Sequence, residues 1–282
     1  MTLPTMNLMS AIIYLAIISQ ILTISVNFAN KWYRRKHFLL TKYPPVDYPN
    51  LYVQDSTVEF NRLNIRKLID RTIAFLSFSV VLFFYLTKAD LEMVASSILI
   101  IAAVQLTPWF LSSYWDKENN SLMAKNFPSS KRKSSFTQRK ITDFVNPSKL
   151  ALAVLSYGLT LVFTLYIYVE QLWHENSNKA LLLILLNTVM VSYLVWLVFN
   201  SLYGKKKDNF INNDDRLKLI ADKCKTLTSY LIMYSVFIMG ICLFRTFDLN
   251  HLYVFAMTGI FIQLIFVLSF TKSVNINYDV YK

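Results

Sequence analysis

The stretch LMSAIIYLAIISQILTISVNFANKWYRRK, Leu8–Lys36, decides the fold of this chain. Its first 22 residues, Leu8–Ala29, carry no charge, and a basic run follows directly. About 20 apolar residues of helix cross a hydrocarbon core of about 30 Å, so the stretch predicts a membrane-spanning helix. It does not resemble a cleaved signal peptide, because no Lys or Arg precedes it and no small residue lies three positions before a cut after Ala29. We expect a permanent helix.

Six further apolar stretches of spanning length follow along the chain. Only 16% of the 282 residues are charged, whereas 55% are hydrophobic, which is typical of a chain dissolved in lipid. Backbone amides find no water in lipid, so each stretch must be helical. The sequence therefore predicts an all-α, polytopic membrane helix bundle, residues 1–282 forming a single transmembrane domain of about seven transmembrane helices (one plus three hairpins). The expected spans are Leu8–Ala29, Thr72–Leu86, Leu91–Ser112, Leu150–Val169, Ala180–Tyr203, Thr226–Phe244 and Leu252–Phe270.

Lysine and arginine gather on one side of these spans. Of the 29 basic residues, 26 fall in the loops 30–71, 113–149 and 204–225 or in the C-terminal tail, and 3 fall on the opposite side. Cytoplasmic loops carry such an excess, which predicts an outside N-terminus and a cytoplasmic C-terminus in a bacterial-type inner membrane. The net charge of +12 therefore follows from topology. We expect anionic lipid headgroups as partners on the cytoplasmic side, and no nucleic acid.

The first of these loops begins with a turn cluster, KYPPVDYPNLYVQD, at Lys42–Asp55. Its three prolines, without Gly or Ser, predict a stiff strap against the inner headgroups. Ser56 and Glu59 then have capping-box spacing, which predicts the start of a juxtamembrane helix. Apolar residues at helical spacing lead from it into the second span: Val58, Ile65, Leu68, Ile69 and Thr72. We expect the strap to dock a cytoplasmic or membrane protein partner through Tyr43, Pro44, Pro45, Tyr48, Pro49 and Tyr52.

Two local patterns concern the later hairpins. Asn146 followed by Pro147 predicts an N-cap and a first helical turn ahead of the fourth span. Hairpins one and three show a weak sequence similarity, because fifteen residues separate Asp90 from Gln105 and likewise Asp248 from Gln263. A duplication would explain this similarity. Chance would explain it as well, since the middle hairpin lacks the spacing.

Groups that commonly do chemistry are missing from the centres of the expected spans. Membrane enzymes and ion-coupled transporters usually place ionisable residues at depth. The chain also lacks a His-Glu-x-x-His zinc motif, a Gly-x-Ser-x-Gly turn and a glycine-rich phosphate loop, and Cys224 and Cys242 fall at different expected depths. We therefore expect no catalytic, cofactor or metal site, and not an enzyme. The last span has no lysine for a retinal Schiff base, and the motifs of G-protein-coupled receptors are missing, so only the span count matches those families.

Uncharged polar residues remain inside the spans. In lipid such groups usually join helices, although a pathway lining is the alternative. Proline at depth also kinks a helix, which singles out VQLTPWF, residues 104–110. The candidate intramembrane polar site or hinge consists of Gln105, Pro108, Asn187 and Gln263.

These observations predict a multi-pass integral membrane protein without catalytic chemistry. We expect a scaffold, complex subunit or sensor that works through its cytoplasmic loops. The alternative is a small transporter or channel for an uncharged or zwitterionic solute that uses the uncharged intramembrane polar groups.

Overall fold

The computed structural model describes residues 8–48, 52, 54–126, 140–172, 177–204, 213–247 and 252–270. Within these ranges every regular element is a helix, in agreement with the predicted all-α bundle. Six helices are long and apolar enough to cross a membrane, and a shorter apolar helix, α9 (Leu252–Phe270), follows them.

The chain begins as one continuous helix of 35 residues, Leu8–Lys42. It consists of α1 (Leu8–Ile21), a π-helical segment η1 (Leu22–Phe28) and α2 (Ala29–Lys42). At about 1.5 Å per residue it is roughly 50 Å long, against about 30 Å for a hydrocarbon core. The helix continues past the expected span end because the basic run contains neither Gly nor Pro before Pro44.

Helix α3 (Ser56–Thr87) joins the expected juxtamembrane helix to the second span in 32 residues. The predicted capping box is wrong, because Asp55 is the N-cap and makes no side-chain cap hydrogen bond. Glu59 instead accepts a hydrogen bond from Asn119 of another helix. At its other end the helix stops at Lys88, whose φ of 53° is left-handed and turns the chain sharply.

The apolar face predicted on α3 points away from the protein. The side chains of Val58, Ile65 and Leu68 are 39%, 49% and 66% exposed. Lipid favours apolar side chains at the surface, so the part of this face within about 30 Å of Lys88 fits a helix in contact with lipid. The opposite face is buried and consists of Leu63, Arg66, Asp70, Ile73, Ala74, Ser77 and Val81.

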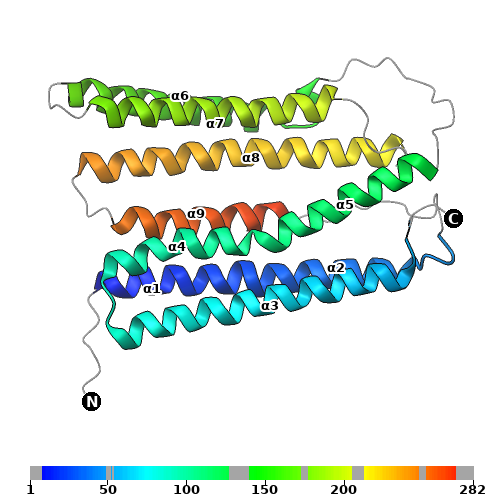
Figure 1. Cartoon of the computed structure of the whole chain (residues 1–282). Helices are drawn as coiled ribbons and strands as arrows, with labels where there is room; N and C mark the ends of the chain where they lie inside the picture. The colour runs from blue at the N-terminus through cyan, green and yellow to red at the C-terminus, as the bar shows by residue number, and fades with distance from the viewer. Residues whose placement is uncertain are drawn as a thin grey trace.

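The expected third span is broken into α4 (Leu91–Gln105) and α5 (Thr107–Asn126). The break falls at Leu106, two residues before Pro108, and Figure 1 shows α5 leaving the direction of α4. Proline has no N–H to donate to the carbonyl of Val104, four residues earlier. The predicted proline kink is therefore confirmed.

The second half holds η2 (Ile141–Asp143), α6 (Pro147–Leu172), α7 (Ser177–Tyr203), α8 (Asn213–Thr246) and α9. The predicted cap of α6 is confirmed, because the Asn146 side-chain oxygen accepts a hydrogen bond of 3.1 Å from the backbone N–H of Ser148. Pro147 is the first residue of the helix, where a backbone N–H would have no partner within the helix, so its lack of an N–H costs no hydrogen bond.

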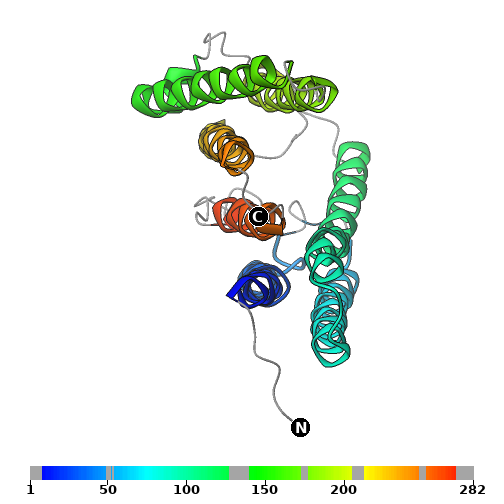
Figure 2. The same ribbon diagram turned by 90° about the vertical axis from the view of Figure 1, so that its left-hand side faces the viewer.

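The helices run roughly parallel or antiparallel, with the short connections gathered at one end (Figure 1). At the other end α2 stops and α3, α6 and α8 start; we call it the basic end, after the charge of its loops. Helices α6, α7 and α8 pack together, whereas α9 packs against α1, α4 and α8. Figure 2 shows α8, α9 and α1 in succession below α6 and α7, with α3, α4 and α5 to one side.

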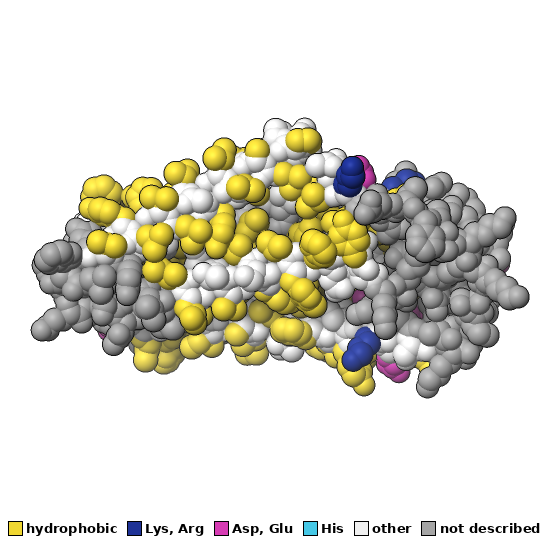
Figure 3. Space-filling model, turned by 90° about the horizontal axis from the view of Figure 1, so that it is seen from above, with side chains coloured by type: hydrophobic (Ala, Val, Ile, Leu, Met, Phe, Trp, Pro, Cys, Tyr) yellow, Lys and Arg dark blue, Asp and Glu magenta, His cyan; other side chains and the backbone are white. Residues whose placement is uncertain are grey.

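The outer surface of the bundle is apolar along its middle. Exposed side chains there include Val154 and Leu155 of α6 and Trp196 and Phe199 of α7. In Figure 3 hydrophobic side chains cover the face seen, and the charged side chains coloured on it lie mostly toward the right-hand, basic end. A hydrophobic waist with charged residues at one end is the pattern of a membrane-spanning bundle.

Candidate functional site

A buried arginine on α3 is the centre of a charged cluster at the basic end. Arg66 is 2% exposed, and its guanidinium carbon lies 3.5 Å from the ring centroid of Trp32 on α2. Its Nε lies 3.6 Å from a carboxylate oxygen of Asp70, one turn further along α3. Its Nη1 donates a hydrogen bond to the hydroxyl of Ser112 on α5. One side chain thus joins three helices.

The depth of this arginine follows from helix geometry. With a rise of about 1.5 Å per residue, Arg66 lies about 33 Å along α3 from Lys88, and Ser112 lies about 33 Å from Asp90. Lys88 and Asp90 are exposed and bound the short α3–α4 connection. A hydrocarbon core is about 30 Å thick, so the arginine lies close to the boundary at the basic end. An arginine there keeps its charge only with partners, which Asp70 and Trp32 supply.

A second network lies one turn nearer the start of α3. Arg62 forms an ion pair of 2.9 Å with Glu118 on α5 and donates a 2.9 Å hydrogen bond to Asn119. Asn119 in turn donates to Glu59 at 2.9 Å. The Arg62 guanidinium also lies 5.7 Å from the ring of Trp115. These contacts fix the end of α5 against the start of α3.

Helix α2 is held to the same cluster by its basic residues. Lys36 lies 3.8 Å from the Asp116 carboxylate, an exposed pair. Between α2 and α3, Lys67 lies 4.0 Å from the ring centroid of Tyr33. We call the set the basic-end cluster; it consists of Trp32, Tyr33, Lys36, Glu59, Arg62, Arg66, Lys67, Asp70, Ser112, Trp115, Asp116, Glu118 and Asn119.

Sequence reasoning did not single out the basic-end cluster, although a signal was present. Arg66 and Asp70 are one turn apart and continue the line of Ser77 and Val81 along α3. In a helix that faces lipid, a polar line opposite the apolar face marks the protein-facing side. The cluster residues on α2 and α5 could not be identified in this way, because tertiary packing alone brings them to α3.

The strap turns back onto the end of α2. The carbonyl of Pro44 accepts hydrogen bonds from the N–H groups of Asp47, at 3.1 Å, and Tyr48, at 3.0 Å. The ring of Tyr48 is buried and meets the ring of Tyr43 edge-on at 5.2 Å. Tyr52 donates a 3.4 Å hydrogen bond to the Leu39 carbonyl. The described start of the strap thus forms a hydrogen-bonded turn at Pro44–Tyr48.

These positions bear on the expected docking role of the strap. The ring of Tyr48 packs inside the turn, where the residue is 8% exposed. Tyr43, Pro44, Pro45 and Tyr52 are half-buried, and Pro49 lies outside the described residues. Val46 in the same turn is 86% exposed.

The structure brings two of the four intramembrane candidates against the first helix. Gln105 of α4 donates a 2.9 Å hydrogen bond to Ser25 in η1 and accepts one of 3.0 Å from Gln20. Gln263 of α9 donates to Ser19 at 3.0 Å. These bonds join α4 and α9 to the α1–η1 helix, which supports the interpretation as structural glue.

A glycine contributes to close packing at this point. A Cβ on Gly259 of α9 would lie 3.2 Å from the side-chain oxygen of Gln20 and 3.2 Å from a methyl group of Ile98. Small residues let membrane helices approach closely. Gly259 thus lets α9 approach α1 and α4 near the glutamines.

Asn187 lies apart from this group, on α7. It is fully buried, and neither of its amide atoms has a hydrogen-bond partner among the described residues. Pro108, the fourth candidate, acts through the break between α4 and α5. The four candidates therefore fall into two glutamines against the first helix, a proline at a helix break and a separate asparagine.

The groups that bind metals are dispersed in the part of the chain that the structure describes. No three His, Cys, Asp or Glu side chains gather there closely enough to hold a metal ion. Cys224 and Cys242 are both buried and form no disulfide with each other. Comparison of the chain with protein-family models, curated proteins and solved structures finds no match.

Proposed function

We propose that this protein is a non-enzymatic, multi-pass membrane protein that serves as a scaffold or complex subunit, with its working surface at the basic end. The observation that carries the proposal is the basic-end cluster, which joins α2, α3 and α5 through ion pairs, cation–π contacts and buried hydrogen bonds. A surface fixed in advance loses little conformational entropy when a partner binds.

Helix length supports a surface that projects from the membrane. The 35-residue first helix and the 32-residue α3 are each about 50 Å long, roughly 20 Å more than a hydrocarbon core requires. On the projecting part, Phe38 and Val46 are 55% and 86% exposed. Full burial of such a side chain on a partner contributes about 1.5–3 kcal/mol.

The same proposal assigns the basic end to the cytoplasm. The 26 basic residues on that side, against 3 on the other, support it. Val46→Cys and Lys88→Cys variants test the orientation, because both positions are exposed and the two native cysteines are buried. In intact cells a membrane-impermeant maleimide is expected to label the Lys88→Cys variant alone. Labelling of the Val46→Cys variant alone would reverse the topology.

A photo-reactive amino acid at Val46 or Phe38 tests the working surface directly. We expect ultraviolet light to give a discrete adduct with a second protein from either position. The matched control is Met93, which is 59% exposed near the opposite end of the bundle. Identical adduct patterns from all three positions, or protein adducts from none, would contradict the proposal.

The transporter alternative has one observation in its favour. Asn187 presents unpartnered amide atoms inside the bundle, as a polar pathway requires. By contrast, Gln105 and Gln263 use their amide groups to hold α4 and α9 against the first helix. The hydrogen bonds of the glutamines therefore favour the scaffold.

A further inference from the structure

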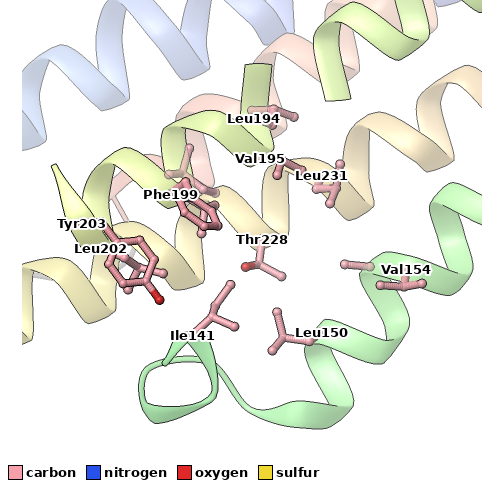
Figure 4. Close-up of a pocket in the computed structure, with 13 residues that line it drawn as sticks. Ile141, Leu150, Val154, Leu194, Val195, Phe199, Leu202, Tyr203, Thr228 and Leu231 are labelled. Atoms are coloured by element: carbon pink, nitrogen blue, oxygen red, sulfur yellow. The ribbon is translucent and has the colours of Figure 1, made fainter. Parts of the chain in front are cut away.

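An apolar groove of about 290 Å³ opens between α6, α7 and α8 at their basic ends. In Figure 4 Leu150 and Val154 of α6 face Leu194 and Phe199 of α7 across it, and Thr228 of α8 lies between them. The lining side chains are hydrocarbon except for the hydroxyl groups of Thr228 and Tyr203. The Thr228 hydroxyl donates to the Cys224 carbonyl of its own helix at 2.8 Å, so it offers the groove no proton.

The groove has a buried floor and an exposed apolar rim. Ala153 and Leu202 on the floor are 3% and 5% exposed. Val154 and Phe199 on the rim are 71% and 62% exposed. A rim of this kind would be unfavourable in water, whereas in a bilayer it opens the groove to lipid chains.

Its length matches one leaflet. Leu194 and Tyr203 mark its extent on α7, and nine residues of helix span about 14 Å. Half of a hydrocarbon core is about 15 Å. Tyr203 is the last residue of α7, so the groove ends where the helix leaves the core at the basic end. It therefore lies in the leaflet at that end, whichever side of the membrane the end faces.

Positive charge surrounds the mouth of the groove. Lys149, next to the lining residue Leu150, donates hydrogen bonds to the Ser229 hydroxyl at 2.6 Å and to the Lys225 carbonyl at 3.0 Å. These bonds hold its ammonium group beside Thr228. Lys140 precedes the lining residue Ile141, and Lys140 and Lys225 are exposed. Asp143, two residues after the lining residue Ile141, also lies near the mouth, and its carboxylate accepts a hydrogen bond from the Lys140 N–H.

We propose that this groove binds one acyl chain of an anionic phospholipid whose headgroup lies against Lys149 and its basic neighbours. The apolar walls take the chain, and the lysines select the headgroup by charge. Each methylene that leaves water for such a site contributes to affinity, but an apolar bilayer removes most of that gain. Discrimination between lipids therefore comes from the headgroup.

Photo-labelling of the full-length protein in nanodiscs of equal phosphatidylglycerol and phosphatidylcholine tests the proposal. A trace of one or the other lipid carries a diazirine in its acyl chain, and labelled peptides are mapped by mass spectrometry. We expect phosphatidylglycerol to label the lining segments 150–154, 194–203 and 227–231 about fivefold more than phosphatidylcholine, which is equivalent to about 1 kcal/mol. Equal labelling by the two lipids would overturn the headgroup assignment.

Variants that fill the groove test its occupancy. Ala153→Trp fills the floor, and Val195→Trp, on the 49% exposed rim, blocks the entrance without disturbing the core. Either change is expected to reduce labelling of segment 227–231 to the level of lipid-facing positions elsewhere. The matched control is Leu155→Trp, on the same helix but 64% exposed and outside the groove. Labelling that is unchanged in the rim variant would exclude acyl-chain binding here.

Discussion

Removal of the partner of a buried charge is the sharpest test of the basic-end cluster. Asp70→Ala leaves Arg66, which is 2% exposed, without its carboxylate at 3.6 Å. An uncompensated buried charge destabilises a protein by about 3–5 kcal/mol. Trp32 and Ser112 still contact the guanidinium, so we expect the lower end of this range, about 3 kcal/mol. At about 2 °C per kcal/mol for a chain of this size, the melting temperature falls by about 6 °C.

The double variant Arg66→Met/Asp70→Ala separates pairing from simple loss of contacts. Replacement of a buried ion pair by apolar side chains is often neutral, so this variant is expected to lie within about 1 kcal/mol of the original protein. The matched control is Asp116→Ala, which breaks the exposed pair with Lys36 and costs about 1 kcal/mol or less.

Thermal unfolding of the purified protein in detergent, followed by size-exclusion fluorescence, measures all three variants. Two results would refute the reasoning. One is an Asp70→Ala protein that melts within about 1 °C of the Asp116→Ala protein, because the two free energies of unfolding would then differ by only about 0.5 kcal/mol. The other is a double variant whose loss equals or exceeds that of Asp70→Ala, because Arg66 would then not be the group left unpaired.

Three further predictions use the same unfolding measurement. Lys88→Gly is expected to stabilise the protein by about 1 kcal/mol, because φ is 53° there and glycine adopts it without strain; a loss of stability would contradict this. Gln105→Leu is expected to cost about 1 kcal/mol, since it removes hydrogen bonds to Ser25 and from Gln20, and an unchanged melting temperature would show that they contribute nothing. Asn187→Leu is expected to stabilise by about 1–2 kcal/mol, because it replaces unpartnered amide atoms with an apolar group of similar size, whereas a loss would reveal a partner.

Much of the fold could be predicted because lipid imposes simple rules on sequence. Uncharged runs located the long apolar helices, the proline at 108 located a break, and Asn146 with Pro147 located the start of α6. Each of these signals is local: it depends on a few neighbouring residues and on the solvent. Distant parts of the chain do not alter them.

The rest depends on contacts between distant residues. Glu59 has capping-box spacing, yet it bonds to Asn119 because the tertiary partner competes with the local one. The apolar face of α3 identified a helix, but in lipid such a face marks the exposed side, so the residues that hold the protein together lay opposite it. The basic-end cluster was hidden for this reason: its arginines look, in sequence, like the flank of a span.

The packing of the helices explains the sequence similarity between hairpins one and three. Gln105 and Gln263 both donate to a serine of the first helix, Ser25 and Ser19 respectively. The helices that carry them, α4 and α9, both pack against α1, whereas α6 and α7 pack mainly with α8. A glutamine therefore occurs on each of the two helices that pack against α1. Contact with the same helix explains the matching positions of Gln105 and Gln263 without a duplication. It follows that Gln105→Leu and Gln263→Leu should weaken the same interface. Their combined cost should depart from the sum of the single costs because both serines belong to one continuous helix.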